Sequence, residues 1–247
     1  MIGAKKFIPS LFTILNAFCG FLSIIESSNS NFDSAAFFII YASVFDMLDG
    51  IVARILNTSS DFGVELDSLS DAISFGAAPS FLLFGIYFRE LGSAGLLLSS
   101  LTMIFAVIRL ARFNVELVGY EKDKFYGLPT PITAITICTY IILYHNKFFN
   151  TRTSGIIITA ISSVLPLLMV SKFQYPVFPK ISLQSVKKNK MIFSILLIFI
   201  VISILTKGYA VFPICVFYIL SGIFFSLYRI VFKARKPVYK TTGRKDN

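Results

Sequence analysis

Long stretches without a charged side chain are the feature that most constrains this sequence. Seven such runs have about the length, roughly 20 residues, that a helix needs to cross a bilayer, and an eighth run contains Asp46, Asp49 and Arg54. Together the runs cover residues 7–25, 34–56, 72–88, 91–108, 125–146, 153–171, 191–206 and 208–228. Because a bilayer core offers no water to backbone groups, each run is predicted to be a helix. We expect an all-α, polytopic transmembrane helix bundle of about eight helices.

Composition and charge agree with a protein that lies in a membrane. Only 15% of the residues are charged and 55% are hydrophobic, whereas a soluble domain carries about 25% charged residues. The net charge of +10 would raise nucleic acid as a partner, but the cations are arranged as topology signals. If the chain reverses at each helix, nineteen of the 23 Lys and Arg residues fall on the side of the N-terminus. The other side keeps Arg89, Lys147, Arg152 and Lys207.

This asymmetry predicts a multi-pass protein of the cell membrane with both termini in the cytoplasm. It predicts membrane lipids, and no nucleic acid, as partners. Residues 1–232 are expected to form a single membrane-embedded domain, and residues 233–247 a basic cytoplasmic tail. Cys19, Cys138 and Cys215 lie far apart inside apolar runs and are expected to be buried thiols.

Four aspartates lie where a membrane protein can least accommodate them. Asp46 and Asp49 are three residues apart on one helix, and Asp67 and Asp71 are four apart on the next, so each pair shares a helix face. The polar turn 57–61 lets the two helices run antiparallel and bring the pairs together near the cytoplasmic side. An unpaired acid inside a bilayer costs at least about 2.5–3.5 kcal/mol, and Arg54 can neutralise only one.

The remaining charges therefore require protonation or bound cations. Ligands that are all oxygen favour Mg²⁺, Mn²⁺ or Ca²⁺ over zinc. Two divalent ions about 4 Å apart, held by carboxylates, are a known arrangement for displacement at phosphorus. The small residues Gly50 and Ala53 beside the acids leave room for a bulky ligand, although they also suit close helix packing.

The full pattern resembles a family signature. Asp-x-x-Asp-Gly-x-x-Ala-Arg, eight residues, then Gly-x-x-x-Asp-x-x-x-Asp, over residues 46–71, resembles the signature of the CDP-alcohol phosphotransferase family. Segments 8–20, 109–114, 127–131 and 171–176 are most similar to members that use L-serine. The resemblance implies an enzyme that moves a phosphatidyl group from CDP-diacylglycerol, or an archaeal CDP-ether lipid, to L-serine and releases CMP. It also implies a homodimer, while the distribution of cations predicts that the active site of the single catalytic domain faces the cytoplasm.

The resemblance also implies roles for individual residues. Two divalent metal ions, Mg²⁺ or Mn²⁺, would be held by Asp46, Asp49, Asp67 and Asp71. Asp71 would in addition be the catalytic base that takes the proton of the acceptor alcohol. The CDP-lipid would be bound by Gly50, Ala53, Arg54, Ser60, Thr13 and Asn16. The carboxylate of serine would be bound by Arg109 and Arg112, with Asn114 and Thr130 as further polar candidates, although the two arginines also fit ordinary topology signals.

Two other functions remain open at this point. The same chemistry could use glycerol 3-phosphate or an inositol-type acceptor, whose second phosphate would call for extra cations in the site. More remotely, a cation transporter could also hold acids within the membrane. A transporter would not need Gly50, Ala53 and Arg54 at fixed offsets from the acids, so the pattern favours the transferase.

Overall fold

The computed structural model describes residues 2–56, 58, 60–117, 126–175 and 190–233. Its regular elements are helices, and Tyr126 and Gln174 form an isolated antiparallel bridge. The helices are α1 (Ile2–Ser28), α2 (Phe32–Leu56), α3 (Asp61–Asp71), the π-helical turn η1 (Ala72–Ala77), α4 (Ala78–Ile86), the short η2 (Phe88–Leu91), α5 (Gly92–Leu117), α6 (Thr130–Leu143), α7 (Thr151–Val170), α9 (Lys190–Leu205) and α10 (Val211–Lys233).

The predicted all-α membrane architecture is confirmed. Because α3, η1 and α4 follow one another directly and η2 leads into α5, the described residues form eight helical segments. Six of these are long and apolar enough to cross a membrane, namely 8–28, 32–56, 61–86, 88–115, 151–170 and 211–229. Many of their large apolar side chains point outward, as lipid contact requires; Phe18, Leu97 and Phe217 are more than half exposed. The sidedness of the termini stays a prediction, and the tail from residue 234 lies outside the described residues.

Two helices begin at other positions than the apolar runs suggested. The run 72–88 is the second half of a longer helical segment that begins at Asp61, because Ser60 caps it: its backbone is extended and its hydroxyl accepts a hydrogen bond from the Gly63 amide at 3.1 Å. In the run 125–146 the helix begins only at Thr130. Gly127, with φ +83°, and Pro129 shape an irregular entry before it.

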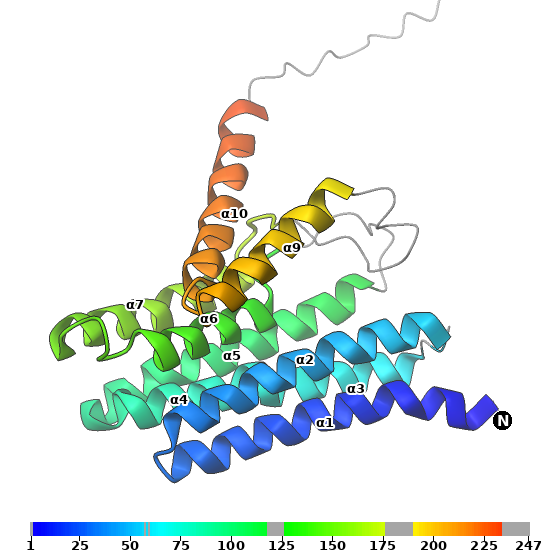
Figure 1. The fold of residues 1–247 in the computed structure, drawn as a ribbon, viewed down its shortest axis with the longest axis horizontal. Coiled ribbons are helices and arrows are strands. Elements are labelled where there is room, and N and C mark those ends of the chain that lie inside the picture. Colours follow the sequence, from blue (N-terminus) through cyan, green and yellow to red (C-terminus); the bar gives the residue numbers. More distant parts are fainter. Residues whose placement is uncertain (1, 57, 59, 118–125, 176–189, 234–247) are drawn as a thin grey trace, which may run out of the picture.

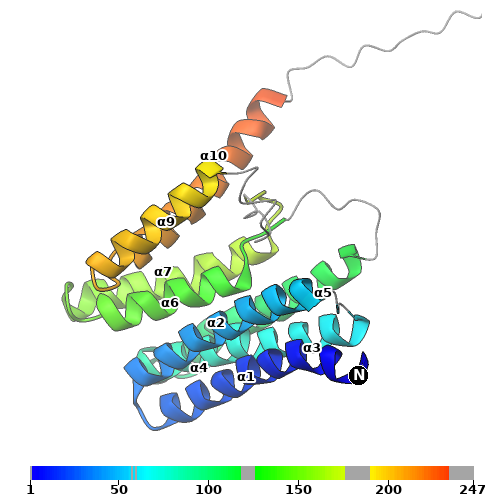
Figure 2. The same ribbon diagram turned by 45° about the vertical axis from the view of Figure 1, so that its right-hand side comes forward.

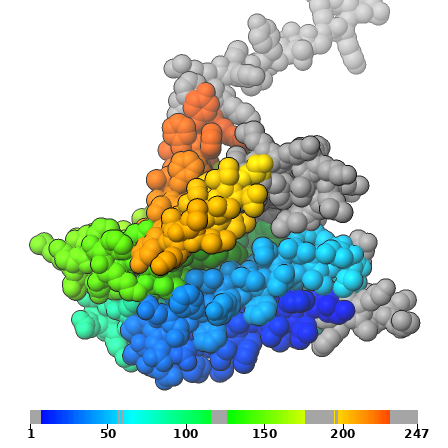
Figure 3. Space-filling model, in the orientation of Figure 1, coloured from blue at the N-terminus to red at the C-terminus, as the bar shows by residue number. Residues whose placement is uncertain are grey.

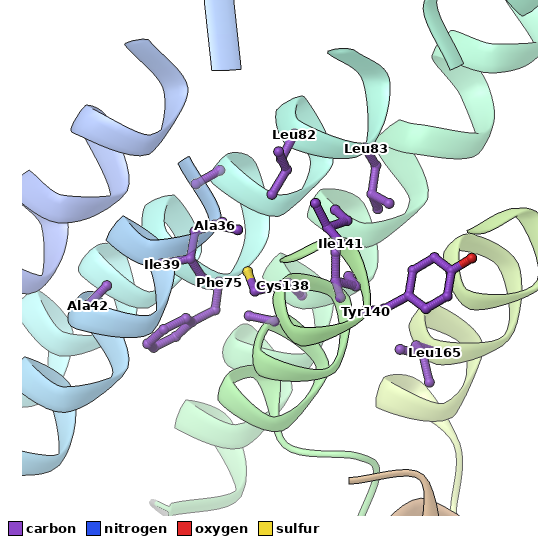
Figure 4. Close-up of a cluster of buried hydrophobic side chains, with 14 of the residues drawn as sticks. Ala36, Ile39, Ala42, Phe75, Leu82, Leu83, Cys138, Tyr140, Ile141 and Leu165 are labelled. Carbon is purple, nitrogen blue, oxygen red and sulfur yellow. The ribbon is translucent and has the colours of Figure 1, made fainter. Parts of the chain in front are cut away.

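The helices from α1 to α7 lie side by side as a bundle, and α10 is steeply inclined to them (Figures 1 and 2). The C-terminal part of α10 stands clear of the other described helices in the space-filling view (Figure 3). Apolar side chains from alanine to phenylalanine fill the centre of the bundle. Figure 4 shows Ala36 and Ile39 of α2 facing Phe75 of η1 and Cys138 of α6. The core therefore joins the N-terminal helices to the middle of the chain.

Helix α1 approaches the helical segment α3–η1–α4 closely at Gly20. A Cβ atom at this position would lie 2.5 Å from Ser74 Oγ and 2.8 Å from Ser74 Cα, so only glycine fits there. Ser74 in turn donates a hydrogen bond of 2.8 Å to the carbonyl oxygen of Asn16. This contact holds the polar face of α1 beside α3, where two of the four aspartates lie.

Candidate active site

Three of the four aspartates converge between α2 and α3. Asp46 and Asp49 come from α2 and Asp67 from α3, and each offers a carboxylate oxygen within 4.8 Å of the others. Asp71 lies one helical turn after Asp67 and is 7% exposed. Asp71 does not belong to the group of three carboxylates that lie within 4.8 Å of one another. The antiparallel pair of polar helix faces expected from the spacing is thus present at one end of the bundle.

Helix α1 supplies the hydrogen bonds that hold two of these acids. Thr13 Oγ1 donates to Asp49 Oδ2 at 2.9 Å, and Asn16 Nδ2 donates to Asp71 Oδ1 at 3.1 Å. Both donors are buried, at 4% and 0% exposure. The resemblance assigned Thr13 and Asn16 to the CDP-lipid, whereas in the structure each also contacts a carboxylate directly. They therefore fix the orientation of the acids.

The donor set suits a hard divalent cation. Like charges this close repel one another, and a cation between them relieves the repulsion. Every candidate ligand atom is a carboxylate oxygen, which favours Mg²⁺, Mn²⁺ or Ca²⁺. Asp67 Oδ1 and Asn16 Oδ1 are in addition buried without a hydrogen-bond partner among the described residues, which leaves both oxygens available to a ligand. The cluster could thus hold a metal ion.

A first cavity, here the Gly50 cavity, opens beside the acids between α1, α2 and α3. Its volume is about 200 Å³. Four of the six residues predicted to bind the CDP-lipid belong to its lining: Thr13, Gly50, Ala53 and Ser60. Asn16 lies deeper, against Asp71, and Arg54 is exposed, with Nη2 3.6 Å from the place of a Cβ atom on Gly50. Pro9, Ser10, Thr58 and Val64 complete the wall with Asp49, Gly63 and Asp67.

A second cavity, here the Arg109 cavity, lies on the other side of α3 and has a volume of about 350 Å³. Arg109, Asn114 and Thr130, three of the four residues predicted to bind serine, line it together with Asp67 and Asp71. Asn114 also accepts a hydrogen bond of 3.1 Å from Ser68 of α3, which ties α5 to the site. The cavity thus combines one guanidinium with two carboxylates.

Arg112, the fourth predicted serine ligand, lies beside this cavity and not in its lining. Its guanidinium donates to the carbonyl oxygens of Val170 at 3.0 Å and of Tyr126 at 2.9 Å. These bonds join α5 to the end of α7 and to the segment before α6. In this structure Arg112 therefore stabilises the packing of α5 against these two segments.

Two tyrosines of the Arg109 cavity were not among the predicted binding residues: Tyr175 entered the sequence analysis only as part of segment 171–176, and Tyr218 was not indicated at all. Tyr175 follows α7 and Tyr218 lies on α10, and both belong to the lining. Their rings pack on each other, with centroids 5.7 Å apart and planes inclined by 30°. No periodic spacing links these residues to the aspartates, because more than a hundred residues separate them. The hydropathy of the last helix predicts a membrane span but gives no indication of a binding site.

The two cavities meet at the acids. Val64 and Asp67 line both, so a ligand in the Gly50 cavity and a ligand in the Arg109 cavity would approach each other at Asp67. The smaller cavity has the small residues Gly50, Ala53 and Gly63 in its wall, and the larger has the cation Arg109. Such an arrangement can bring two substrates together at a carboxylate cluster that suits divalent metal.

The sequence is similar to a known family and to several named proteins. The family model CDP-alcohol phosphatidyltransferase matches residues 6–171. A protein of Helicobacter pylori named CDP-diacylglycerol–serine O-phosphatidyltransferase is 34% identical over 231 residues, which are 92% of this chain and 95% of that protein. A Bacillus subtilis protein of the same name is 33% identical over 75% of this chain and 98% of its own length. An archaetidylserine synthase of Methanothermobacter thermautotrophicus is 38% identical over 68% of this chain and 69% of its own.

Proposed function

The chain belongs to the CDP-alcohol phosphatidyltransferase family, and we propose that it transfers the phosphatidyl group of CDP-diacylglycerol to L-serine. The observation that carries this proposal is the meeting of two unlike cavities at Asp67. The names of the relatives from Helicobacter pylori and Bacillus subtilis support the serine acceptor. The archaetidylserine synthase among the relatives supports a CDP-activated ether lipid as the other candidate donor.

In this proposal the Gly50 cavity receives the cytidine diphosphate part of the donor. Gly50 and Ala53 carry almost no side chain, so the ligand can approach the backbone of α2 closely. Arg54 is at the rim of this region, and a guanidinium is suited to bind phosphate through two parallel hydrogen bonds. Ser60, at the start of α3, offers a hydroxyl group and the positive end of a helix to the same phosphates.

The Arg109 cavity receives serine. A free amino acid carries a carboxylate, to which the cavity offers the guanidinium of Arg109, while Asp67 and Asp71 lie in the same lining for the chemistry at the serine hydroxyl. Asn114 and Thr130 add hydrogen-bonding groups to the same wall. Among the described lining residues Arg109 is the one cation, which suits a zwitterion better than an acceptor with its own phosphate.

Asp71 is proposed as the base. The hydroxyl oxygen of serine forms a bond to the phosphorus that carries the lipid, and the bond from this phosphorus to the bridging oxygen breaks. CMP leaves with that oxygen, and the hydroxyl proton passes to Asp71. Because Asn16 donates to Oδ1 of Asp71, the carboxylate is held in one orientation and its other oxygen is available for the proton.

Asp46, Asp49 and Asp67, with Asp71 at the neighbouring turn, are proposed to hold two divalent cations, Mg²⁺ or Mn²⁺. The chemistry that such cations supply when bound is neutralisation of the pyrophosphate and of the leaving phosphate. Thr13 and Asn16 keep the carboxylates oriented for this task. We further propose that this end of the bundle faces the cytoplasm, as the distribution of cations along the chain predicts, and that the protein is a homodimer, which light scattering of the purified protein would test.

The decisive experiment measures CMP release by the purified protein with Mg²⁺ and CDP-diacylglycerol. Separate reactions contain L-serine, glycerol 3-phosphate, inositol or no acceptor, and a parallel set replaces the donor with a CDP-activated ether lipid. We expect release that depends on L-serine, and none in the Asp67→Asn variant, which lacks the carboxylate shared by both cavities. Equal release with glycerol 3-phosphate or inositol would refute the serine acceptor.

A further inference from the structure

The segment after α7, here the strap, contributes Tyr175 to the wall of the Arg109 cavity. The strap, Phe173–Tyr175, pairs with the segment before α6: the Gly127 amide donates to the Phe173 carbonyl at 2.9 Å, and Tyr126 bridges to Gln174. Gly127 approaches the end of α7 so closely that a Cβ atom there would overlap the Met169 carbonyl oxygen. The position of the strap is therefore tied to the wall that contains Thr130.

Helix α10 holds the strap from the other side. The Gln174 amide donates to Ser226 Oγ at 2.7 Å, and Ser226 Oγ donates back to the Gln174 carbonyl at 3.3 Å. Arg229 also donates to the side-chain oxygen of Gln174. The Tyr175 ring lies directly on Gly222, where a Cβ atom would overlap the ring atoms. The Tyr175 ring can thus pack against α10 because residue 222 is a glycine.

The Tyr175 side chain seated in this way lines the Arg109 cavity and is 5% exposed. Its hydroxyl oxygen is buried and has no hydrogen-bond partner among the described residues, and the same is true of Thr130 Oγ1 in the same lining. A buried hydroxyl without a partner is unfavourable, because the group has given up its hydrogen bonds to water. Such groups in the wall of a cavity are accounted for when a polar ligand occupies it.

We propose that Tyr175 binds the carboxylate of the amino-acid acceptor through its hydroxyl group, and that α10 is the element that positions it. The proposal rests on the proposed function. It adds a specificity residue from outside residues 6–171, the part of the chain that the family model matches. It also assigns a function to the last helix, because Gly222 and Tyr218 contact the Tyr175 ring and Ser226 holds the backbone of the preceding Gln174.

The ionisation state of Tyr175 is compatible with this role. Burial, and to a smaller extent the neighbouring Tyr218, raises the pKa of Tyr175 to about 12. At neutral pH the hydroxyl is therefore protonated and can donate a hydrogen bond to a carboxylate. A hydrogen bond to a charged partner is among the stronger ones in proteins.

The test is the Tyr175→Phe variant, which removes only the hydroxyl oxygen. We expect its KM for serine to rise about 10- to 150-fold, the usual range for losing a hydrogen bond to a charged group. The KM for CDP-diacylglycerol and the kcat at saturating serine should stay close to those of the wild type. Tyr140→Phe is the matched control: Tyr140 is equally buried, but its hydroxyl donates to the Ser154 carbonyl at 3.2 Å, away from the cavity.

A second variant tests the positioning by α10. Gly222→Ala should displace the Tyr175 ring and raise the KM for serine while the KM for the donor is kept. Ser221→Ala, one residue earlier on the same helix, should leave both values unchanged. A serine KM for Tyr175→Phe within twofold of the wild type, or an equal rise in both KM values, would overturn this inference alone. A wild-type protein that releases no CMP with serine would overturn the proposed function, and this inference with it.

Discussion

The residues of the site have different surroundings, and these determine the expected effect of replacing each one. Asp71 lies in the Arg109 cavity with Asn16 holding one of its oxygens. We expect Asp71→Asn to lower turnover about 10²- to 10⁴-fold, the usual contribution of a general base, while the CDP-lipid still binds. Steady-state kinetics and an equilibrium binding measurement would separate the two effects. The control is Asp33→Asn, because Asp33 is an exposed acid that pairs with Lys147 at 3.7 Å. Near-normal turnover of Asp71→Asn would exclude Asp71 as the base.

Thr13 acts on the cluster through Asp49, so its effect should appear in the cation dependence of the reaction. Thr13→Val keeps the shape of the side chain but removes the bond of 2.9 Å to Asp49 Oδ2. Residues that orient metal ligands typically contribute about 10- to 100-fold in metal affinity or activity. We expect the Mg²⁺ or Mn²⁺ concentration for half-maximal activity to rise within this range, and Thr13→Ser to restore it. An unchanged cation dependence in Thr13→Val would argue against a metal at Asp49.

At the scale of elements, two arginines one turn apart on α5 have different surroundings. Arg109 lines the cavity, whereas Arg112 bonds to the carbonyl oxygens of Val170 and Tyr126. Arg109→Ala should raise the KM for serine about 10- to 150-fold, as the loss of a charge-assisted hydrogen bond implies. Arg112→Ala should mainly lower Tm, by about 2–4 °C for each kcal/mol lost in a chain of this length.

Thermal unfolding in detergent and serine kinetics on both variants would separate these functions. Each variant is the control for the other, because both replace an arginine of α5 with alanine. An unchanged Tm for Arg112→Ala, together with a serine KM as high as that of Arg109→Ala, would mean that Arg112 binds the acceptor directly, as the sequence alone suggested.

At the scale of the whole molecule, the acids are the reason that the protein should depend on a divalent cation. The carboxylates come from two different helical segments and lie within 4.8 Å of one another, so their mutual repulsion must be relieved in the working enzyme. We expect excess EDTA to abolish CMP release and Mg²⁺ or Mn²⁺ to restore it. Full turnover in EDTA, with no metal retained on the protein by elemental analysis, would contradict the two-metal proposal.

Much of the architecture could be predicted from the sequence because it depends on local properties. The length and apolarity of a run determine whether it crosses a membrane, and the helical period determines which residues share a face. The all-α bundle follows from the first. The pairing of Asp46 with Asp49 on one face and of Asp67 with Asp71 on the next follows from the second. Helix boundaries were less predictable, since the cap at Ser60 and the irregular entry at Gly127 interrupt or extend the apolar runs.

The tertiary structure alone decided which faces meet. The helical period says that Thr13 and Asn16 lie on one side of α1, but not that Gly20 brings this side against Ser74 and so toward the acids. It likewise cannot say that Arg109 faces a cavity while Arg112 faces backbone carbonyls, or that Tyr175 is seated on Gly222 of α10. The physical reason is that such contacts join residues far apart in the chain, and their partners are chosen by the packing of whole helices rather than by spacing within one helix.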